Sequence, residues 1–267
     1  MNAIETTKIP VPDGELYAEV VGSGPPIVLL HAGFLGVQMW DEQLELADEH
    51  QLIRYEARSH GRSSTAMRDH HPYQDLLAVL DHFGLESASL VGNSMGGATS
   101  LTFALEHPDR VRRMVLFGPG VPPVEFRDPF IIEHHRAQDA AKEAMDAEAY
   151  LDALVRYAVD GPHRQPDQVD PELRRRCRDM AMTTIMNHHT ATGALLEEDV
   201  RSRLEEIAAP TVLVVGELES SDLHRMAGEA ARRMPNAELV EFTGCGHMTN
   251  NEEPQRANDL IRRHLAG

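Results

Sequence analysis

Residues 89–100 read SLVGNSMGGATS, a serine among glycines at the junction of an apolar run and a helix-like stretch. A short apolar run reaches Gly92, and Ser94 follows two residues later with Gly96 behind it. A tight turn alone would explain the glycines. The surroundings favour more, because a strand candidate precedes the serine and a helix candidate follows it. Small residues two before and two after a serine allow a strand–turn–helix elbow that exposes the hydroxyl, so Ser94 is a candidate nucleophile.

Short apolar runs with strand character alternate with helical patterns along most of the chain. Several runs are apolar on both faces, as in buried parallel strands. The strand candidates are 15–21, 26–30, 51–57, 87–92, 113–118, 211–217 and 237–243, and the helix candidates between them include 75–84, 94–108 and 221–235. This alternation predicts an α/β fold with a doubly wound, mostly parallel sheet of eight strands. The turn signal Asp13-Gly14 predicts that the sheet begins with an antiparallel hairpin.

The alternation stops between about Pro122 and Ala208, where the chain is rich in Ala, Glu, Arg, Met and His. This stretch contains no strand candidate, so we expect a helical insertion over one end of the sheet. The expected organisation is a core of residues 1–121 and 208–267 with a helical cap of residues 122–207. Methionines in the cap fit either a helix packed on the core or an adaptable apolar wall over a substrate; they are Met180, Met182 and Met186.

Composition excludes several classes of partner. The formal net charge of −18 repels nucleic acid and anionic lipid, so we expect neither nucleic acid nor a membrane as a partner. The chain shows no secretory signal and no apolar run long enough to span a bilayer, which favours a cytoplasmic protein. Cys177 and Cys245 form no metal-binding pair, and the histidine pairs lack ligand spacing, so no metal is expected. A monomer and a homodimer both remain open.

A serine nucleophile needs a base, and the base needs an acid that orients it. Of the fifteen histidines, His247 is the best placed, because it lies in FTGCGHMTNNEEP just after the last strand candidate. The acid is expected after strand 211–217, where GELESSD offers three candidates: Glu217, Glu219 and Asp222. An oxyanion hole needs two backbone N–H groups. One is expected from Met95, and the other from the loop HAGFLG, where Gly33 or Phe34 is available.

Five segments in order resemble the α/β-hydrolase fold superfamily, in its lidded, esterase-like branch. They are LLHAGF, RYEARSHGRSS, GNSMGG, VVGELES and GCGHMTNNEEP, and together they span nearly the whole chain. The resemblance implies Ser94 as nucleophile, His247 as base, and the amides of Gly33 and Met95 as oxyanion donors. It also implies Glu219 as the acid, three residues after the glycine that ends the strand, with Asp222 as the alternative.

The sequence departs from the family pattern at four positions. Glutamate stands at position 219, where aspartate is usual, and the extra methylene must be accommodated by the loop. Ala32 and Ser59 replace glycines, and Glu56 replaces an aspartate. Glycine alone adopts a positive φ without penalty. We therefore expect this chain to meet the conformational demands at positions 32 and 59 in a different way from the family.

The activity implied is hydrolysis of a carboxylic ester or lactone through an acyl-enzyme on Ser94, without a cofactor. The segments QMWDEQLELADEHQLIRYEARSHGRS and NSMGGATSLTFALEHPDRVRRMVL are similar to 3-oxoadipate enol-lactonases and small esterases. We expect a small to medium, partly apolar substrate, with Phe34 and Met248 lining its pocket. A C–C bond hydrolase, a cyclase or a perhydrolase on the same scaffold remains an alternative. So does a ligand-binding protein with weak turnover.

Overall fold

The computed structural model describes residues 3–266 and contains one sheet with strand order β1-β2-β4-β3-β5-β6-β7-β8. Strands β4, β3, β5, β6, β7 and β8 run parallel, whereas β2 pairs antiparallel with both of its neighbours, β1 and β4. This confirms the eight-stranded, mostly parallel α/β fold. The strands are β1 (Glu5–Val11), β2 (Gly14–Val21), β3 (Pro26–Leu30), β4 (Gln51–Tyr55), β5 (Ala88–Asn93), β6 (Val111–Phe117), β7 (Thr211–Gly216) and β8 (Ala237–Phe242).

The antiparallel hairpin turns one residue earlier than its sequence signal indicates. The register of β1 and β2 ends with Val11 paired to Gly14, so the loop consists of Pro12 and Asp13. Asp13 has a φ of 71°, a conformation that aspartate tolerates in turns. Gly14 is the first residue of β2, and a glycine is needed there because a Cβ would lie 2.4 Å from the Cβ of Ser64.

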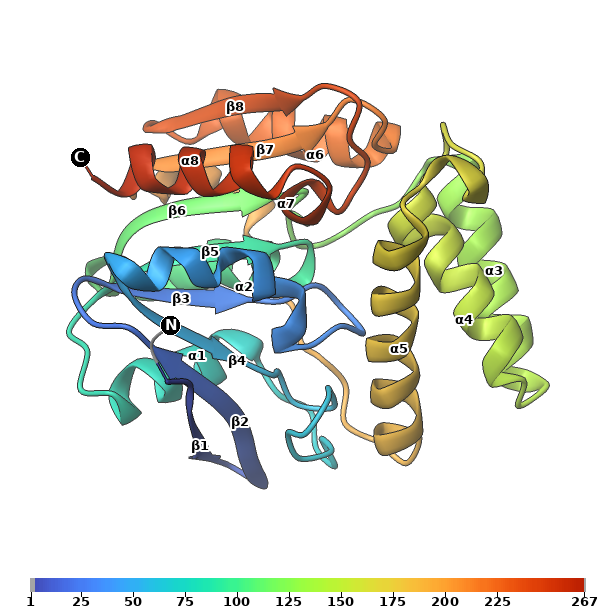
Figure 1. The fold of residues 1–267 in the computed structure, drawn as a ribbon, viewed down its shortest axis with the longest axis horizontal. Coiled ribbons are helices and arrows are strands. Elements are labelled where there is room, and N and C mark those ends of the chain that lie inside the picture. Colours follow the sequence, from blue (N-terminus) through green and yellow to red (C-terminus); the bar gives the residue numbers. More distant parts are fainter. Residues whose placement is uncertain (1–2, 267) are drawn as a thin grey trace.

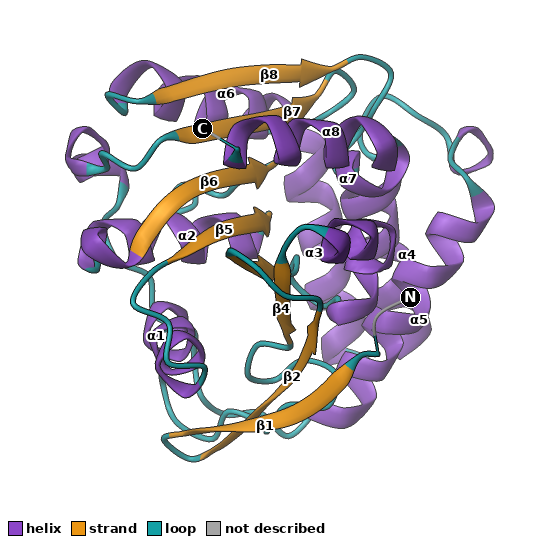
Figure 2. Cartoon of the chain, turned by 60° about the vertical axis from the view of Figure 1, so that its left-hand side comes forward, coloured by secondary structure: helices purple, strands orange, loops and turns teal. Residues whose placement is uncertain are grey.

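Helices cover both faces of the sheet, as Figure 2 shows. One face packs against α1 (Pro72–His82), α2 (Met95–Glu106) and α6 (Ser221–Arg233), and the other against the 3₁₀ helix Val37–Asp48 and α8 (Pro254–Leu265). The sequence of β3 is apolar throughout because the strand is buried on both faces. Val28 and Leu30 belong to the first layer of the core, and Ile27 and Leu29 to the second.

Three helices follow β6 and lie together at the arrowhead end of the central strands, as Figure 1 shows. They are α3 (Pro129–Glu143), α4 (Ala147–Val155) and α5 (Pro171–His188), with a π-helical turn at Arg156–Asp160. Each begins behind an aspartate whose side chain accepts an N–H of the first turn, a favourable N-cap; these are Asp128, Asp146 and Asp170. Residues 122–207 contain no strand in the structure.

Short elements complete the chain: 3₁₀ turns at Pro108–Arg110, Pro166–Gln168 and Arg201–Glu206, and the helix α7 (Thr249–Glu252). No helix within residues 3–266 is long and apolar enough to cross a membrane. Because parallel strands end at one edge of the sheet, the loops after β3, β5, β6, β7 and β8 meet beneath the three helices. Ligands of open α/β sheets bind at this edge.

Candidate active site

The elbow between β5 and α2 holds Ser94 in a strained conformation. Its φ is 51° and its ψ is −109°, which is unusual for a residue with a Cβ. The backbone is held on both sides. The N–H of Ser94 donates to the carbonyl of Phe117 at 2.9 Å, and its carbonyl accepts the N–H of Ala98 at 3.0 Å. The strand β6 and the first turn of α2 therefore fix the serine at the carboxyl edge of the sheet.

The glycine spacing around Ser94 is a steric requirement. A Cβ on Gly92 would lie 2.6 Å from the carbonyl carbon of Gly96. A Cβ on Gly96 would lie 2.1 Å from the carbonyl oxygen of Leu30 on β3. Both contacts involve backbone atoms, which cannot move aside cheaply. The elbow closes only because both positions are glycine.

The structure brings His247 and Glu219 together. The Nδ1 atom of His247 lies 2.5 Å from Oε2 of Glu219, and the second carboxylate oxygen accepts the N–H of Ser220 at 2.8 Å. His247 is 9% exposed and Glu219 is 4% exposed. Gly118, which follows β6 with a φ of 49°, lies against the imidazole: a Cβ there would lie 2.9 Å from the ring. The extra methylene of Glu219 is thus accommodated within hydrogen-bonding reach.

Burial and charge act against each other in this pair. Burial disfavours the charged form of both groups, but the opposite charge and the hydrogen bond of the partner outweigh it. As a result, the pKa of Glu219 lies below its usual range and the pKa of His247 lies above its usual value. A proton on Nδ1 is held by the carboxylate, so Nε2 is the nitrogen free to accept another.

The two other acid candidates point elsewhere. Asp222 accepts the N–H groups of Arg127 and Asp128, both at 2.7 Å, and pairs with Arg225 at 2.9 Å. It therefore anchors the segment that leads into α3. Glu217 is exposed and accepts the N–H of Gly244 at 2.8 Å.

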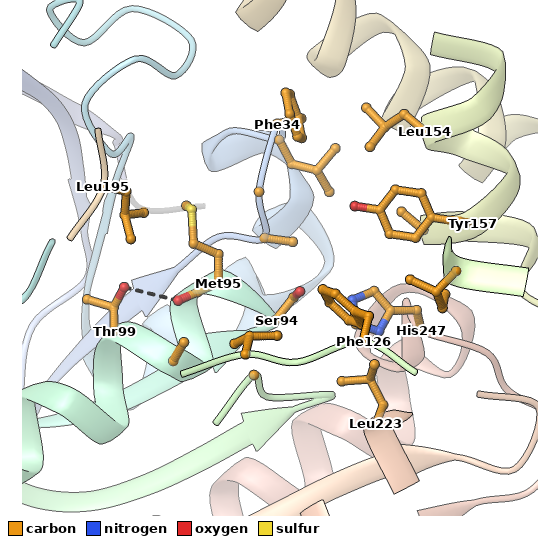
Figure 3. Close-up of a pocket in the computed structure, with 18 of the residues that line it drawn as sticks. Phe34, Ser94, Met95, Thr99, Phe126, Leu154, Tyr157, Leu195, Leu223 and His247 are labelled. Atoms are coloured by element: carbon orange, nitrogen blue, oxygen red, sulfur yellow. Dashed lines mark hydrogen bonds between the residues drawn. The ribbon is translucent and has the colours of Figure 1, made fainter. Parts of the chain in front are cut away.

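A cavity of about 280 Å³ lies between the sheet edge and the three helices, lined by Ser94, Glu219 and His247. Figure 3 shows Ser94 close to His247, with Phe34, Leu154 and Tyr157 around the opposite side. Phe34 and Met248, the pocket residues expected from sequence, both line it. Most of the remaining wall is apolar, including Leu35, Val124, Phe126, Ile131, Val155, Val159, Leu195, Leu196, Leu223 and Met226.

The hypothesis of a methionine wall is wrong. None of the three cap methionines lines the cavity: Met180 and Met182 pack against apolar clusters, and Met186 is 59% exposed. The side chains that α5 places at the cavity are Cys177 and Ala181. Cys177 and Ala181 are four residues apart and share one face of α5, whereas the three methionines lie on other faces of the helix.

Gly33 and Met95, the candidate oxyanion donors, line the same cavity. Met95 is the first residue of α2, so its N–H has no partner within the helix. The loop of Gly33 is held by His31, whose Nε2 accepts the N–H of Ala57 at 2.9 Å and whose Nδ1 donates to the carbonyl of Ala32 at 2.7 Å. Burial lowers the pKa of His31 to about 4, which keeps this bridge neutral near pH 7.

The departures from the family pattern have local explanations. Ser59 adopts the positive φ of a glycine, 58°, and its Oγ accepts the N–H of Ala66 at 2.9 Å. Glu56 is buried and accepts the N–H of Arg62 at 2.6 Å. Its carboxylate fills the space where Gly61 would place a Cβ, 2.4 Å away. Ala32 is not among the residues with positive φ.

Two further residues of the site were missed by sequence reasoning. Tyr157, on the π-helical turn, directs its hydroxyl into the cavity (Figure 3), and no sequence pattern marks it. Asn93 is fully buried and its amide donates to Asn250 at 3.1 Å and to the carbonyl of His247 at 3.5 Å. The signal for Asn93 was present: an amide beside the candidate nucleophile ends an otherwise apolar strand.

No group of three or more His, Cys, Asp or Glu side chains within residues 3–266 is arranged to hold a metal ion. The polar side chains that line the cavity are those of Ser94, His247 and Glu219, a few other hydroxyls, and the exposed Glu197. Such a constellation is suited to nucleophilic attack on a carbonyl group.

Known proteins are similar to this chain in sequence and in architecture. The model of the family described as alpha/beta hydrolase fold matches residues 25–254. The putative carbamate hydrolase RutD of Caulobacter sp. (strain K31) is 28% identical, covering 94% of this chain and 96% of that protein. The putative 2-succinyl-6-hydroxy-2,4-cyclohexadiene-1-carboxylate synthase of Bacillus subtilis (strain 168) is 27% identical, covering 97% and 98%.

Among solved structures, Est816, described as an N-acyl homoserine lactone degrading enzyme, superposes with a TM-score of 0.78 at 23% identity. The match covers 96% of this chain and 99% of that one, and shows a shared fold. The family match spans most of the chain and includes Ser94, Glu219 and His247. The chain belongs to the alpha/beta hydrolase fold family.

Proposed function

We propose that this hydrolase cleaves uncharged carboxylic esters or lactones through an acyl-enzyme on Ser94. The observation that carries the proposal is the buried pair of His247 and Glu219 in one apolar cavity with the strained elbow serine. A glutamate three residues beyond the end of β7 is the acid, because it alone of the three candidates contacts the imidazole. Asp222 keeps a structural role.

The mechanism follows from the tautomer. Glu219 holds the Nδ1 proton of His247, so Nε2 accepts the hydroxyl proton as Ser94 Oγ attacks the carbonyl carbon. The backbone N–H groups of Gly33 and Met95 stabilise the oxyanion of the tetrahedral intermediate. The imidazolium then protonates the leaving alkoxide, and the acyl group remains on Ser94. Water, deprotonated by His247, then attacks the acyl-enzyme ester; the bond to Ser94 Oγ breaks, the imidazolium returns the proton to Ser94 Oγ, and the carboxylic acid is released.

We further propose that residues 122–207 act as a cap that supplies the outer wall of the cavity. Leu154, Tyr157 and Val159 line the cavity from this segment, opposite Ser94 (Figure 3). A wall of this kind excludes water and fits the acyl or alkyl part of a small to medium substrate. The volume of about 280 Å³ lies near the lower end of the range for small-molecule sites.

The charges of the cavity select the substrate class. No lysine or arginine is among the described residues that line it, and the carboxylate of Glu197 lies at its rim. A substrate carboxylate would therefore be buried without a cationic partner, which costs several kcal/mol. The net charge of −18 adds long-range repulsion of anions. Neutral acyl groups fit this environment, and carboxylate-bearing ones do not.

The compounds named for the relatives differ in how well their charge and size fit this cavity. A product named as a carboxylate, as for the Bacillus subtilis relative, would leave its charge unpaired here. A neutral lactone with an acyl tail, of the kind named for Est816, meets no such penalty. A carbamate, as named for the Caulobacter relative, is small compared with the apolar wall. Esters and lactones with an apolar acyl group are therefore the substrates we propose.

A matched pair of esters tests the proposal. In p-nitrophenyl hemisuccinate a carboxylate replaces the terminal methyl group of p-nitrophenyl butyrate, with the same leaving group. We expect kcat/KM for the hemisuccinate to be at least about 100-fold lower. A simple alkyl lactone and an N-acyl homoserine lactone extend the panel. The Ser94→Ala variant supplies the background rate for each compound.

Two results would overturn separate parts of the proposal. Equal or faster hydrolysis of the hemisuccinate would refute the neutral substrate class while leaving the serine mechanism in place. No turnover dependent on Ser94 with any ester or lactone would refute the hydrolysis of esters and lactones altogether. A C–C bond hydrolase or a binding protein would then be the better account.

A further inference from the structure

Arg164 is a buried guanidinium in the loop after the π-helical turn, and its side chain is engaged on all its nitrogens. It is 8% exposed. Its Nε donates to the carbonyl of Asp160 at 2.9 Å, and one terminal nitrogen donates to the carbonyl of Val159 at 2.8 Å. These carbonyls belong to the turn that carries Tyr157 and Val159 into the cavity. One side of the guanidinium therefore fixes the cap wall.

The other side of the guanidinium meets the loop of His247. Both terminal nitrogens of Arg164 donate to the carboxylate of Glu252 on α7, one of them at 3.2 Å. The same carboxylate accepts the N–H of Gly246, at 3.1 Å to each oxygen. Gly246 immediately precedes His247. The guanidinium packs so closely on this backbone that a Cβ on Gly246 would lie 2.1 Å from its nitrogen.

We propose that Arg164 is a positioning residue that couples the cap wall to the His247 loop through Glu252 and Gly246. We name this arrangement the Arg164 clamp; it comprises Arg164, Glu252 and Gly246. A bidentate arginine–carboxylate pair fixes direction as well as distance, which a lysine cannot reproduce. The clamp thereby sets the position of the imidazole relative to the cavity wall. Its role in turnover rests on the proposed function, whereas the coupling itself is independent of it.

The clamp also belongs to the electrostatic surroundings of His247. Glu219 faces the imidazole from the loop after β7, and Glu252 acts on it from α7; both raise its pKa. His224 contributes to the lowered pKa of Glu219, and Glu219 contributes to the raised pKa of Tyr157. In Arg164→Ala the charge of Glu252 is no longer neutralised, so the pKa of His247 rises further. In Glu252→Gln that negative charge is absent, so the pKa falls.

The test measures the His247 titration by NMR in protein with ¹³C-labelled histidine, with the signal assigned from a His247→Gln variant. The expected shifts have opposite signs in Arg164→Ala and Glu252→Gln. Arg164→Lys keeps the charge but not the bidentate geometry. It is therefore expected to leave the His247 pKa near that of the wild type while lowering kcat for p-nitrophenyl butyrate about 10- to 100-fold. This variant keeps the test decisive even if the alanine variant does not fold.

The matched control is Arg178→Ala. Arg178 is also a cap arginine paired with two carboxylates, Glu148 and Asp152, but both lie on α4 and away from the His247 loop. We expect its His247 titration and kcat to match the wild type. Millimolar guanidinium is expected to restore part of the kcat of Arg164→Ala, as it refills the vacated space.

The outcomes separate this proposal from the proposed function. A kcat within about twofold of wild type in Arg164→Lys, or His247 shifts of equal sign in Arg164→Ala and Glu252→Gln, would refute the clamp. Shifts of opposite sign without any turnover dependent on Ser94 would support the clamp and refute the ester and lactone hydrolysis. Loss of kcat in Arg178→Ala as large as that in Arg164→Lys would also refute the clamp, because a general loss of cap stability would then explain both.

Discussion

The cavity has a core side and a side formed by residues 122–207, the proposed cap, and the two are built on different principles. On the core side, backbone contacts enforce the geometry: Ser94 is strained between strand and helix, and glycines at 92, 96 and 118 leave no room for a Cβ. On the cap side, packing of exchangeable apolar side chains and a few ion pairs, including that of Arg164, hold the wall in place.

This difference predicts how each side responds to change. A substitution on the core side displaces backbone or the His247–Glu219 pair and acts on the chemical step. A substitution on the cap side removes contact area and acts mainly on binding. The exception on the cap side is Arg164, because it reaches the His247 loop.

The largest effect is expected at the acid. Glu219→Gln removes the carboxylate that orients His247 and stabilises the imidazolium, and we expect kcat/KM to fall by about 10³- to 10⁴-fold. Asp222 lies three residues after Glu219 but accepts the N–H groups of the segment before α3. In Asp222→Asn, kcat/KM should therefore fall by less than about tenfold. Steady-state kinetics with p-nitrophenyl butyrate measures both. Similar losses of kcat/KM in the two variants would contradict the assignment of Glu219 as the acid and of Asp222 as a structural residue.

A pair of glycines gives the next effect. Gly118→Ala adds a Cβ 2.9 Å from the His247 ring at a φ of 49°, so we expect a loss of kcat of about 100-fold. Gly33→Ala adds a Cβ that meets nothing within 4 Å and keeps the backbone N–H. Its thermal midpoint should stay near the wild-type value, and its loss of kcat should be the smaller of the two. If Gly33→Ala were the more damaging of the two, steric enforcement would not be what distinguishes the core side.

The cap wall should respond more weakly. Leu154→Ala shortens a buried side chain on α4 at the cavity, and we expect KM for p-nitrophenyl butyrate to rise about three- to tenfold with kcat within about threefold. Met186→Ala on α5 is the control, because Met186 is 59% exposed and away from the cavity. A fall in kcat larger than the rise in KM in Leu154→Ala would contradict the assignment of the cap wall to binding.

The pH dependence gives the smallest change and tests the coupling of the pair. His247 must be neutral to accept a proton, and its pKa is raised because Glu219 outweighs burial. The acidic limb of kcat/KM should therefore have its midpoint above pH 6.5, with activity lost as the pH falls. In Glu219→Gln the only remaining opposition to burial is the smaller effect of Glu252, so the pKa of His247 falls and the residual activity should show this limb at lower pH. A limb that moves to higher pH in the variant would show that the carboxylate does not act on His247.

The core side could be predicted from sequence because steric demands leave a local signature. Glycines two before and two after Ser94 mark the elbow, and apolar runs such as Pro26–Leu30 mark buried strands. Residues that meet across the fold carry no such signature. Choosing Glu219 over Asp222 needed the family pattern, and the contact with His247 appears only once the loops after β7 and β8 are side by side.

The cap side could not be predicted to the same depth. A helical insertion follows from composition, but which face of α5 meets the cavity depends on how the helices pack, and the methionine hypothesis failed for that reason. Tyr157 enters the cavity from a π-helical turn, which periodicity does not reveal. Arg164 lies in an irregular loop and finds Glu252 88 residues later in the chain. Its burial and its partners are properties of the assembled fold.

The proposed mechanism places the acyl group of the intermediate on Ser94. Rapid acid quench of wild-type protein mixed with p-nitrophenyl butyrate, followed by mass spectrometry of its peptides, tests this directly. We predict a butyryl group on the peptide containing Ser94 of the wild type, and no such group in Ser94→Ala. Turnover that persists in Ser94→Ala, or a butyryl group found only on another residue, would contradict the account.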